Sequence, residues 1–148
     1  MKRFLLILTL IPGLLLLSSC KKESKEDVTY YLAFYQVGDY VKSDHAADIK
    51  TLIQNAVDDW KKEYRFNWSA EDGKSLKEQD AAALQYMEDA FASFSKVATK
   101  LKADILEVDP NPTLTLSWTF EAMRKDTKPV RLGTARKVEI LNGDQSLD

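Results

Sequence analysis

Hydrophobic and polar residues recur along the chain in patterns that predict strands and helices in turn. Residues 28–37 are rich in aromatic and β-branched side chains and end at Gly38-Asp39, which predicts a strand followed by a turn. Residues 49–64 then repeat apolar side chains at intervals of three and four, which predicts an amphipathic helix that Ser43 or Asp44 can cap. The repeating apolar residues are Ile49, Leu52, Ile53, Ala56, Val57, Trp60 and Tyr64.

A second, longer helix and two further strands follow. Helical spacing returns at Leu76 and continues to Ala103 or Asp104, and the prolines within residues 109–112 then predict a loop. Residues 113–123 alternate between apolar and polar side chains, which predicts a strand with one buried and one solvated face. A short polar connection leads to a last predicted strand at residues 130–141. Its core-facing residues are expected to be Val130, Leu132, Val138 and Ile140.

The order of these elements predicts the class of fold. Strand, helix, helix, strand, strand indicates an α+β two-layer sandwich, in which two helices cover one face of a small antiparallel sheet. The polar outer face of residues 113–123 agrees with a sheet that is covered on one side only. We therefore expect a single domain over residues 28–141, with residues 65–74 as a polar helix-helix connection and residues 142–148 as a loose tail.

The first residues have the three-part layout of a signal peptide. Met1-Lys2-Arg3 is positively charged, and residues 4–17 contain eleven large apolar side chains. This apolar run is shorter than the ~20 residues that a membrane-spanning helix needs. It ends at Ser18-Ser19-Cys20, before the charged Lys21-Lys22-Glu23. We expect residues 1–19 to be a cleaved leader rather than a transmembrane anchor.

Leu17-Ser18-Ser19-Cys20 resembles the lipobox of bacterial lipoproteins, in which small residues precede an invariant cysteine. The resemblance covers about the first twenty residues. It implies cleavage before Cys20, a diacylglycerol on the Cys20 sulfur and an acylated amino terminus, so that Cys20 anchors the protein to a membrane almost irreversibly. Lys21 and Lys22, where inner-membrane lipoproteins of enteric-type bacteria carry Asp, imply sorting to the outer membrane. Whether the protein would face the periplasm or the cell surface stays open.

Composition and charge place the rest of the chain among ordinary globular domains. The 148 residues are 45% hydrophobic and 30% charged, with a formal net charge of -2 and a pI near 5.5, which argues against a nucleic-acid partner. Residues 20–27 would form the lipidated cysteine and its tether, in which residues 21–27 carry three positive and three negative charges and no apolar side chain. Seven extended residues reach at most about 25 Å, so the domain would work close to the membrane.

Candidate catalytic and metal sites are scarce. His45 is the single histidine, and a thioether at Cys20 leaves no thiolate, so a zinc site would lack ligands. No Gly-x-Ser-x-Gly motif accompanies His45, and the isolated glycines form no phosphate-binding loop. We expect no metal, no cofactor and no enzymatic activity. An envelope hydrolase or a solute-binding accessory that uses His45 or a pair of carboxylates stays an alternative, because pairing among 23 acids is not readable from sequence.

The first predicted strand offers a candidate binding surface. It is apolar or aromatic on both faces, so if the helices cover the face of Tyr30 and Phe34, then Tyr31 and Tyr35 stand on the outer face near Thr115, Ser117 and Thr119. Tyrosine rings beside hydroxyl groups suit a glycan, a peptide or a protein partner. The structural alternative is that Arg131 and Lys137 cover this second face. We expect a lipoprotein that binds another envelope component, the third possibility being a structural spacer.

Overall fold

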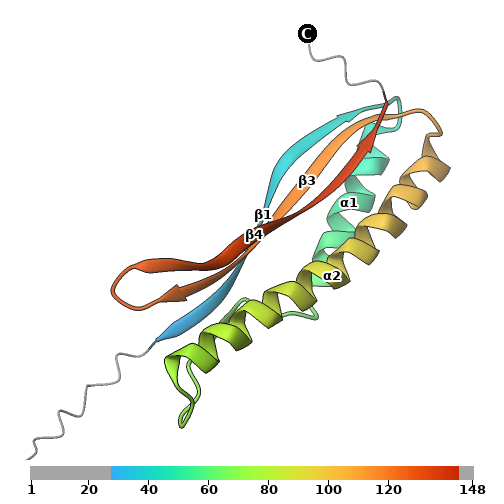
Figure 1. The fold of residues 1–148 in the computed structure, drawn as a ribbon. Helices are drawn as coiled ribbons and strands as arrows, with labels where there is room; N and C mark the ends of the chain where they lie inside the picture. The colour runs from blue at the N-terminus through green and yellow to red at the C-terminus, as the bar shows by residue number, and fades with distance from the viewer. Residues whose placement is uncertain (1–27, 144–148) are drawn as a thin grey trace, which may run out of the picture.

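The predicted α+β two-layer sandwich is confirmed. The computed structural model describes residues 28–143. Its elements, in order, are β1 (Thr29–Lys42), α1 (Ala46–Lys61), β2 (Asn67–Ser69), α2 (Leu76–Val108), β3 (Thr113–Lys125) and β4 (Pro129–Asn142). The strands form one antiparallel sheet in the order β2-β1-β3-β4. Both helices lie on one face of this long, twisted sheet, and no element of residues 28–143 covers the other face (Figure 1).

The short strand β2 is an addition to the predicted order. Its three residues lie in the segment expected to be a polar connection, and they pair with Thr29, Tyr30 and Tyr31 of β1. Trp68 of β2 stacks on the ring of Tyr30 with 6.1 Å between the ring centroids. A run of three residues shows no periodicity, so only its pairing with β1 marks it as a strand.

Strand β1 is longer than the sequence predicted, because Gly38-Asp39 is not a turn. The register with β3 shifts between Gln36 and Gly38, which marks a β-bulge, and pairing then continues to Lys42. A Cβ atom at Gly38 would lie 2.9 Å from Ser117 Oγ on β3. Glycine is therefore needed here for close approach of two strands rather than for a chain reversal.

The start of α1 also differs from the prediction. His45 occupies the N-cap position and makes no side-chain capping bond, so neither Ser43 nor Asp44 is the cap. Ser43 Oγ instead accepts a hydrogen bond from the His45 backbone N–H and donates one to the carboxylate of Asp109. The hydroxyl thus ties the start of α1 to the end of α2.

Helix α2 begins where predicted and ends four or five residues later than predicted, at Val108. Ser75 and Glu78 form a capping box, in which the Ser75 hydroxyl accepts from the Glu78 N–H and the Glu78 carboxylate accepts from the Ser75 N–H. Ile105 continues the apolar stripe and is fully buried, so the helix extends to Val108. The prolines that follow then end it.

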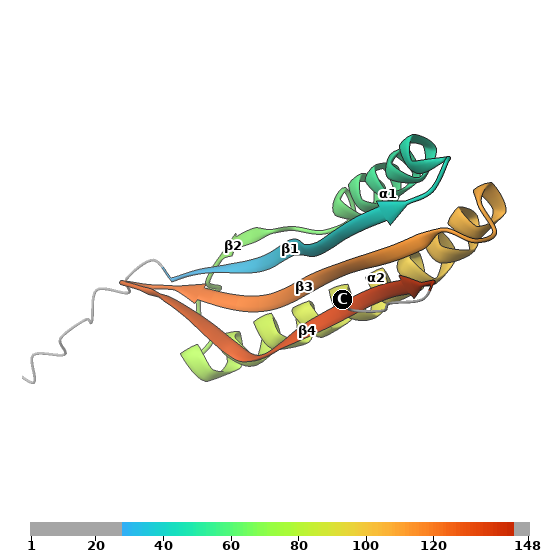
Figure 2. The ribbon, with the colours of Figure 1, turned by 90° about the horizontal axis from the view of Figure 1, so that it is seen from above.

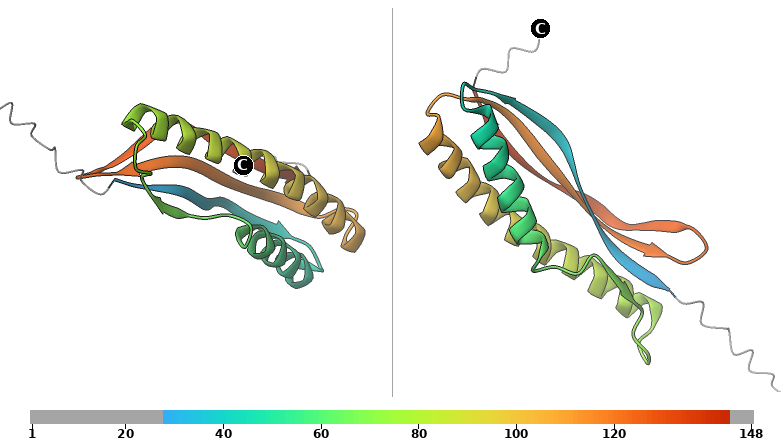
Figure 3. Two further views of the ribbon diagram at one scale, coloured as in Figure 1. Left: turned by 90° about the horizontal axis from the view of Figure 1, so that it is seen from below. Right: turned by 180° about the vertical axis from the view of Figure 1, so that it is seen from behind.

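Aromatic rings from every layer form the centre of the core. The Phe94 ring of α2 lies 5.0 Å from the Trp60 ring of α1, 5.1 Å from that of Trp118 and 5.2 Å from that of Phe34. Phe94 and Trp118 are fully buried. The two views in Figure 3 show both helices running along one face of the sheet. The aromatic rings fill the space between that face and the helices.

The last two strands follow the predicted alternation, with longer boundaries. Side chains of β3 at alternating positions face the helices and are buried: Leu114, Leu116, Trp118, Phe120 and Ala122. In β4, Leu132, Val138 and Ile140 are buried as predicted, whereas Val130 is 40% exposed because it lies near the tip of the β3-β4 hairpin. Asn142 belongs to β4 and not to the predicted tail, and residues 144–148 lie outside the described residues.

Candidate functional site

The uncovered face of the sheet, termed here the outer face, presents the tyrosines of β1. The helices cover Tyr30 and Leu32, which are buried, so the intervening Tyr31 points outward as predicted and is half-buried. Tyr35 is 46% exposed and lies opposite Thr119 of β3. The predicted position of Tyr31 and Tyr35 on this face, beside hydroxyl-bearing side chains, agrees with the structure.

Tyr40 is a third outer-face tyrosine that the sequence reasoning missed. It is 51% exposed and lies opposite Thr115, beyond the bulge in β1. The turn expected at Gly38-Asp39 placed Tyr40 outside the sheet. Tyr40 and Val41 could have indicated that the strand continues after Gly38, because aromatic and β-branched residues are enriched in strands.

Long charged side chains from β4 occupy the opposite side of the outer face. Arg131 forms an ion pair with Glu121, with 3.1 Å between Nη1 and Oε1, and Lys137 pairs with Glu139 on its own strand at 2.5 Å. Lys137 lies in the same cross-strand row as Tyr35. These side chains nevertheless leave nearly half of the Tyr35 surface exposed, so they do not close the face.

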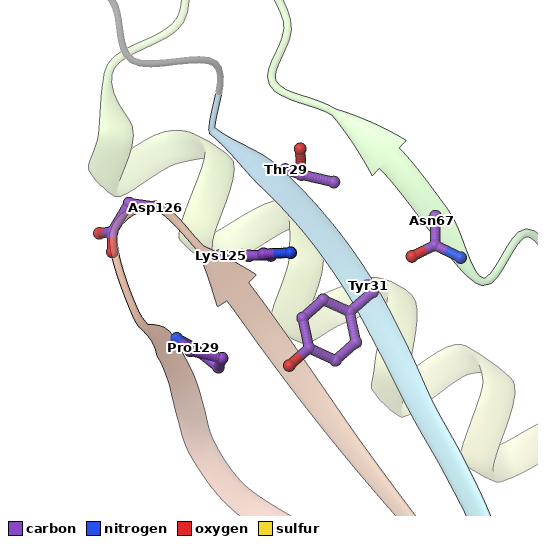
Figure 4. Close-up of a pocket in the computed structure, with 6 residues that line it drawn as sticks. All are labelled: Thr29, Tyr31, Asn67, Lys125, Asp126 and Pro129. Atoms are coloured by element: carbon purple, nitrogen blue, oxygen red, sulfur yellow. The ribbon is translucent and has the colours of Figure 1, made fainter.

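A hollow of about 450 Å³ lies on the outer face at one end of the sheet. Its lining residues are Thr29, Tyr31, Asn67, Lys125, Asp126 and Pro129. Figure 4 shows the Tyr31 ring between β1 and β3, with the Lys125 side chain extending from β3 towards β1. This is the end of the sheet at which β1 begins (Figure 1), and it is termed here the tether end after the tether expected at residues 21–27. The hollow thus joins an aromatic ring to a small group of polar side chains.

The charges around the hollow are not equivalent. A hydrogen bond from the Lys128 backbone N–H lowers the pKa of Asp126, and its carboxylate also lies 3.5 Å from Arg124 Nε. Lys125 has no ion-pair partner among residues 28–143. The unpaired charge of the hollow is therefore the Lys125 ammonium, and the Asn67 amide and the Thr29 hydroxyl line the same hollow. This set of groups suits a polar ligand that carries a negative charge.

A second polar cluster lies under the same end of the sheet, between the sheet and α2. Tyr30 Oη donates to Asp80 Oδ1 at 2.8 Å, and Arg124 Nη1 donates to Asp80 Oδ2 at 2.5 Å. Burial and the hydrogen bond to Asp80 raise the pKa of Tyr30 to about 12. Because Tyr30 is buried and both partners are only slightly exposed, this cluster links β1, β3 and α2 rather than meeting a ligand. Sequence reasoning did not find it, since its residues are 50 and 44 positions apart.

The remaining predicted site residues stand apart from this face. His45 lies at the distal end of the sheet, opposite the tether end, where its Nδ1 is 3.9 Å from Asp48 Oδ2 and both side chains are exposed. Among residues 28–143, no cluster of three or more His, Cys, Asp or Glu side chains is arranged to hold a metal ion. Cys20 lies outside the described residues. Within the described range, neither helix is long and apolar enough to cross a membrane.

Comparison of the chain with protein-family models, with curated proteins and with solved structures gave no match. What the chain does must therefore be inferred from its own residues and geometry.

Proposed function

We propose that this protein is a lipid-anchored bacterial envelope protein whose single domain binds another envelope component through the outer face of its sheet. The observation that carries the proposal is the pair of exposed rings, Tyr35 and Tyr40, on a sheet face that neither α1 nor α2 covers. Tyrosine supplies a large contact area with a polar tip and loses little conformational entropy on binding. A sheet face that served only as a spacer would need no such rings.

The anchor part of the proposal rests on the leader and the lipobox-like Leu17-Ser18-Ser19-Cys20. With Cys20 acylated, residues 21–27 would hold the domain within about 25 Å of the bilayer. The hollow at Tyr31 and Lys125 lies at the tether end, so it would be the part of the outer face nearest to the membrane. The partner we propose is a protein or glycan of the envelope, at the outer membrane.

Photo-crosslinking in intact cells tests the binding surface. A benzophenone amino acid at position 35 should form a discrete adduct with an envelope component, and alanine at Tyr31 and Tyr40 should reduce that adduct several-fold. The matched control places the same probe at Lys100, an exposed position on α2 whose side chain is 77% accessible. Equal crosslinking from positions 35 and 100, or none from position 35, would count against the outer face.

Inhibition of signal peptidase II tests the anchor. Globomycin should cause a lipid-modified precursor to accumulate that is longer by residues 1–19, and Cys20→Ser should abolish lipid labelling. The control is metabolic labelling with a palmitate analogue of a known lipoprotein in the same cells. Normal processing of the chain in the presence of globomycin would show that Cys20 is not a lipoprotein cysteine.

A further inference from the structure

The two edges of the sheet differ in the groups that lie beside them. At one edge, β2 pairs with the first three residues of β1, and the Leu32 N–H then donates to the Phe66 carbonyl at 3.1 Å. Beyond this point no strand of residues 28–143 lies beside β1 on the side away from β3. Residues 33–42 therefore form an edge that is paired on one side only, termed here the open edge of β1.

The opposite edge, along β4, carries features that hinder pairing. Pro129 lacks an N–H group at the start of the strand, and Gly133 has a φ of 65° where the register with β3 is irregular. The Lys102 ammonium donates to the Leu141 carbonyl at 2.9 Å, and the Arg136 guanidinium folds back over the Phe91 ring at 4.5 Å. These are the devices by which proteins keep an edge strand from pairing.

The open edge of β1 also contains a β-bulge, between Gln36 and Gly38, but it exposes apolar side chains next to backbone groups that face away from β3 and that no strand of residues 28–143 pairs. Tyr35, Val37 and Tyr40 are 46%, 60% and 51% exposed, and all three belong to this segment. Backbone N–H and C=O groups alternate in direction along a strand, so those of Phe34 point to the same side as the Leu32 N–H. An extended chain lying there would meet both hydrogen-bonding groups and apolar contacts.

Helix α1 supplies two positive charges beside this edge, whereas Asp39 of the edge supplies one negative charge on the same side of the sheet. Figures 2 and 3 show α1 running along the distal part of β1, on the side away from β3. Lys61 Nζ lies 5.6 Å from the centroid of the Phe34 ring, so this stripe of α1 faces β1. Lys50 is eleven residues earlier, which is close to three helical turns, and so lies on the same stripe. Neither ammonium has an ion-pair partner among residues 28–143.

We propose that the open edge of β1 binds an extended acidic segment of a partner protein, which adds to the sheet as a strand in line with β2. Alternating side chains of an added strand point to opposite faces. Apolar residues of the segment would contact Tyr35 and Tyr40 on the outer face, and carboxylates between them would meet Lys50 and Lys61 on the helix side. The partner's signature is thus a run of about ten residues in which apolar and acidic side chains alternate.

This inference rests on the proposed binding function and names the chemistry of the partner. It is tested with the purified full chain in detergent, without any envelope component, by fluorescence anisotropy of a labelled decapeptide of alternating Val and Glu. We expect saturable binding that weakens at least tenfold when Glu is replaced by Lys. Alternate N-methylation of the peptide should abolish binding, because it removes the backbone donors that face β1.

Charge reversal on the protein locates the site. Lys50→Glu combined with Lys61→Glu should lower the affinity for the Val-Glu peptide tenfold or more and should allow the Val-Lys peptide to bind. The matched control is Lys77→Glu with Lys128→Glu, an equal change of charge at the tether end, which should leave the affinity within twofold. Hydrogen exchange should slow at Phe34 and Val41 in the complex, and not along β4.

The opposite results would overturn the proposal. They are absence of binding, equal binding of a block peptide of five Val and five Glu, binding that survives N-methylation, or protection confined to β4. Each of these outcomes concerns the open edge alone. Crosslinking from position 35 in cells would still report separately on the proposed envelope function.

Discussion

The phenol of Tyr30 donates a hydrogen bond to the carboxylate of Asp80 over 2.8 Å, and this bond joins the first strand of the sheet to the long helix α2. Arg124 of β3 donates to the other oxygen of the same carboxylate. One acid thereby satisfies groups from two adjacent strands at the end of the domain nearest Val28. The cluster positions the hairpin and the hollow above it, so its energetics determine how rigid that end is.

Tyr30→Phe should lower the free energy of unfolding by about 1 kcal/mol at pH 7, since it removes one hydrogen bond in a buried setting. The folded-state pKa of Tyr30 is raised from 10.0 to about 12, so its stabilisation is complete below pH 10 and is lost as the pH rises through 12. Urea unfolding at pH 7, 10 and 11.5 should show a shallower alkaline decline in the variant. Tyr35→Phe is the control. A similar loss of unfolding free energy in that variant would show that the effect is not specific to the Tyr30 hydrogen bond.

Asp80→Ala should lower the free energy of unfolding by about 1–3 kcal/mol, because it leaves both Tyr30 and the Arg124 guanidinium without their main acceptor. Arg124 would keep only Asp126, whose carboxylate is 3.5 Å from its Nε. Arg124→Met should lower the free energy of unfolding by less. A double-mutant cycle measured by urea unfolding should give a coupling of about 1 kcal/mol between Asp80 and Arg124. Strictly additive losses would mean that the two side chains contribute independently.

Phe94→Ala should cost about 3–5 kcal/mol, because it opens a cavity where rings from α1, β1 and β3 meet. Phe91→Ala on the same helix is the matched control. Phe91 is only partly buried and should cost less. Calorimetry of both variants measures the difference. An equal fall in melting temperature would contradict the claim that Phe94 contributes more to stability than Phe91.

Ser75→Ala should loosen the first turn of α2 without unfolding the domain. Hydrogen bonds from the Ser75 side chain and backbone lower the pKa of Glu78, so loss of the hydroxyl should move that pKa back towards its ordinary value. Amide exchange in the first turn should rise roughly fivefold, the effect of losing an N-cap. Side-chain NMR titration measures the pKa, and an unchanged value would show that the backbone bond alone holds it down.

The local patterns of the chain were sufficient for the strand at residues 113–123 and for both helices. Alternation over eleven residues and a repeat of three and four are intrinsic to the geometry of one strand or one helix. They need no knowledge of the rest of the molecule. The α+β class followed from the order of these elements for the same reason.

Features that depend on a partner far along the chain needed the tertiary structure. Gly38 is indistinguishable from a turn residue until Ser117 is beside it, and β2 is too short to be recognised without its pairing to β1. Asp80 reads as a polar helix residue until Tyr30 and Arg124 reach it.

The sequence by itself determined where the two helices and the three long strands lie and which faces of β3 and of the helices are apolar. It is also the whole basis for the proposed anchor at Cys20. It did not determine which face of β1 meets the helices, because both faces are apolar or aromatic, so local pattern leaves the choice undecided. Only the packing of Tyr30 and Leu32 against the helices turned Tyr31 and Tyr35 outward. Only the strand order left residues 33–42 paired on one side alone, by β3, among the described residues, since an edge is a property of the whole sheet.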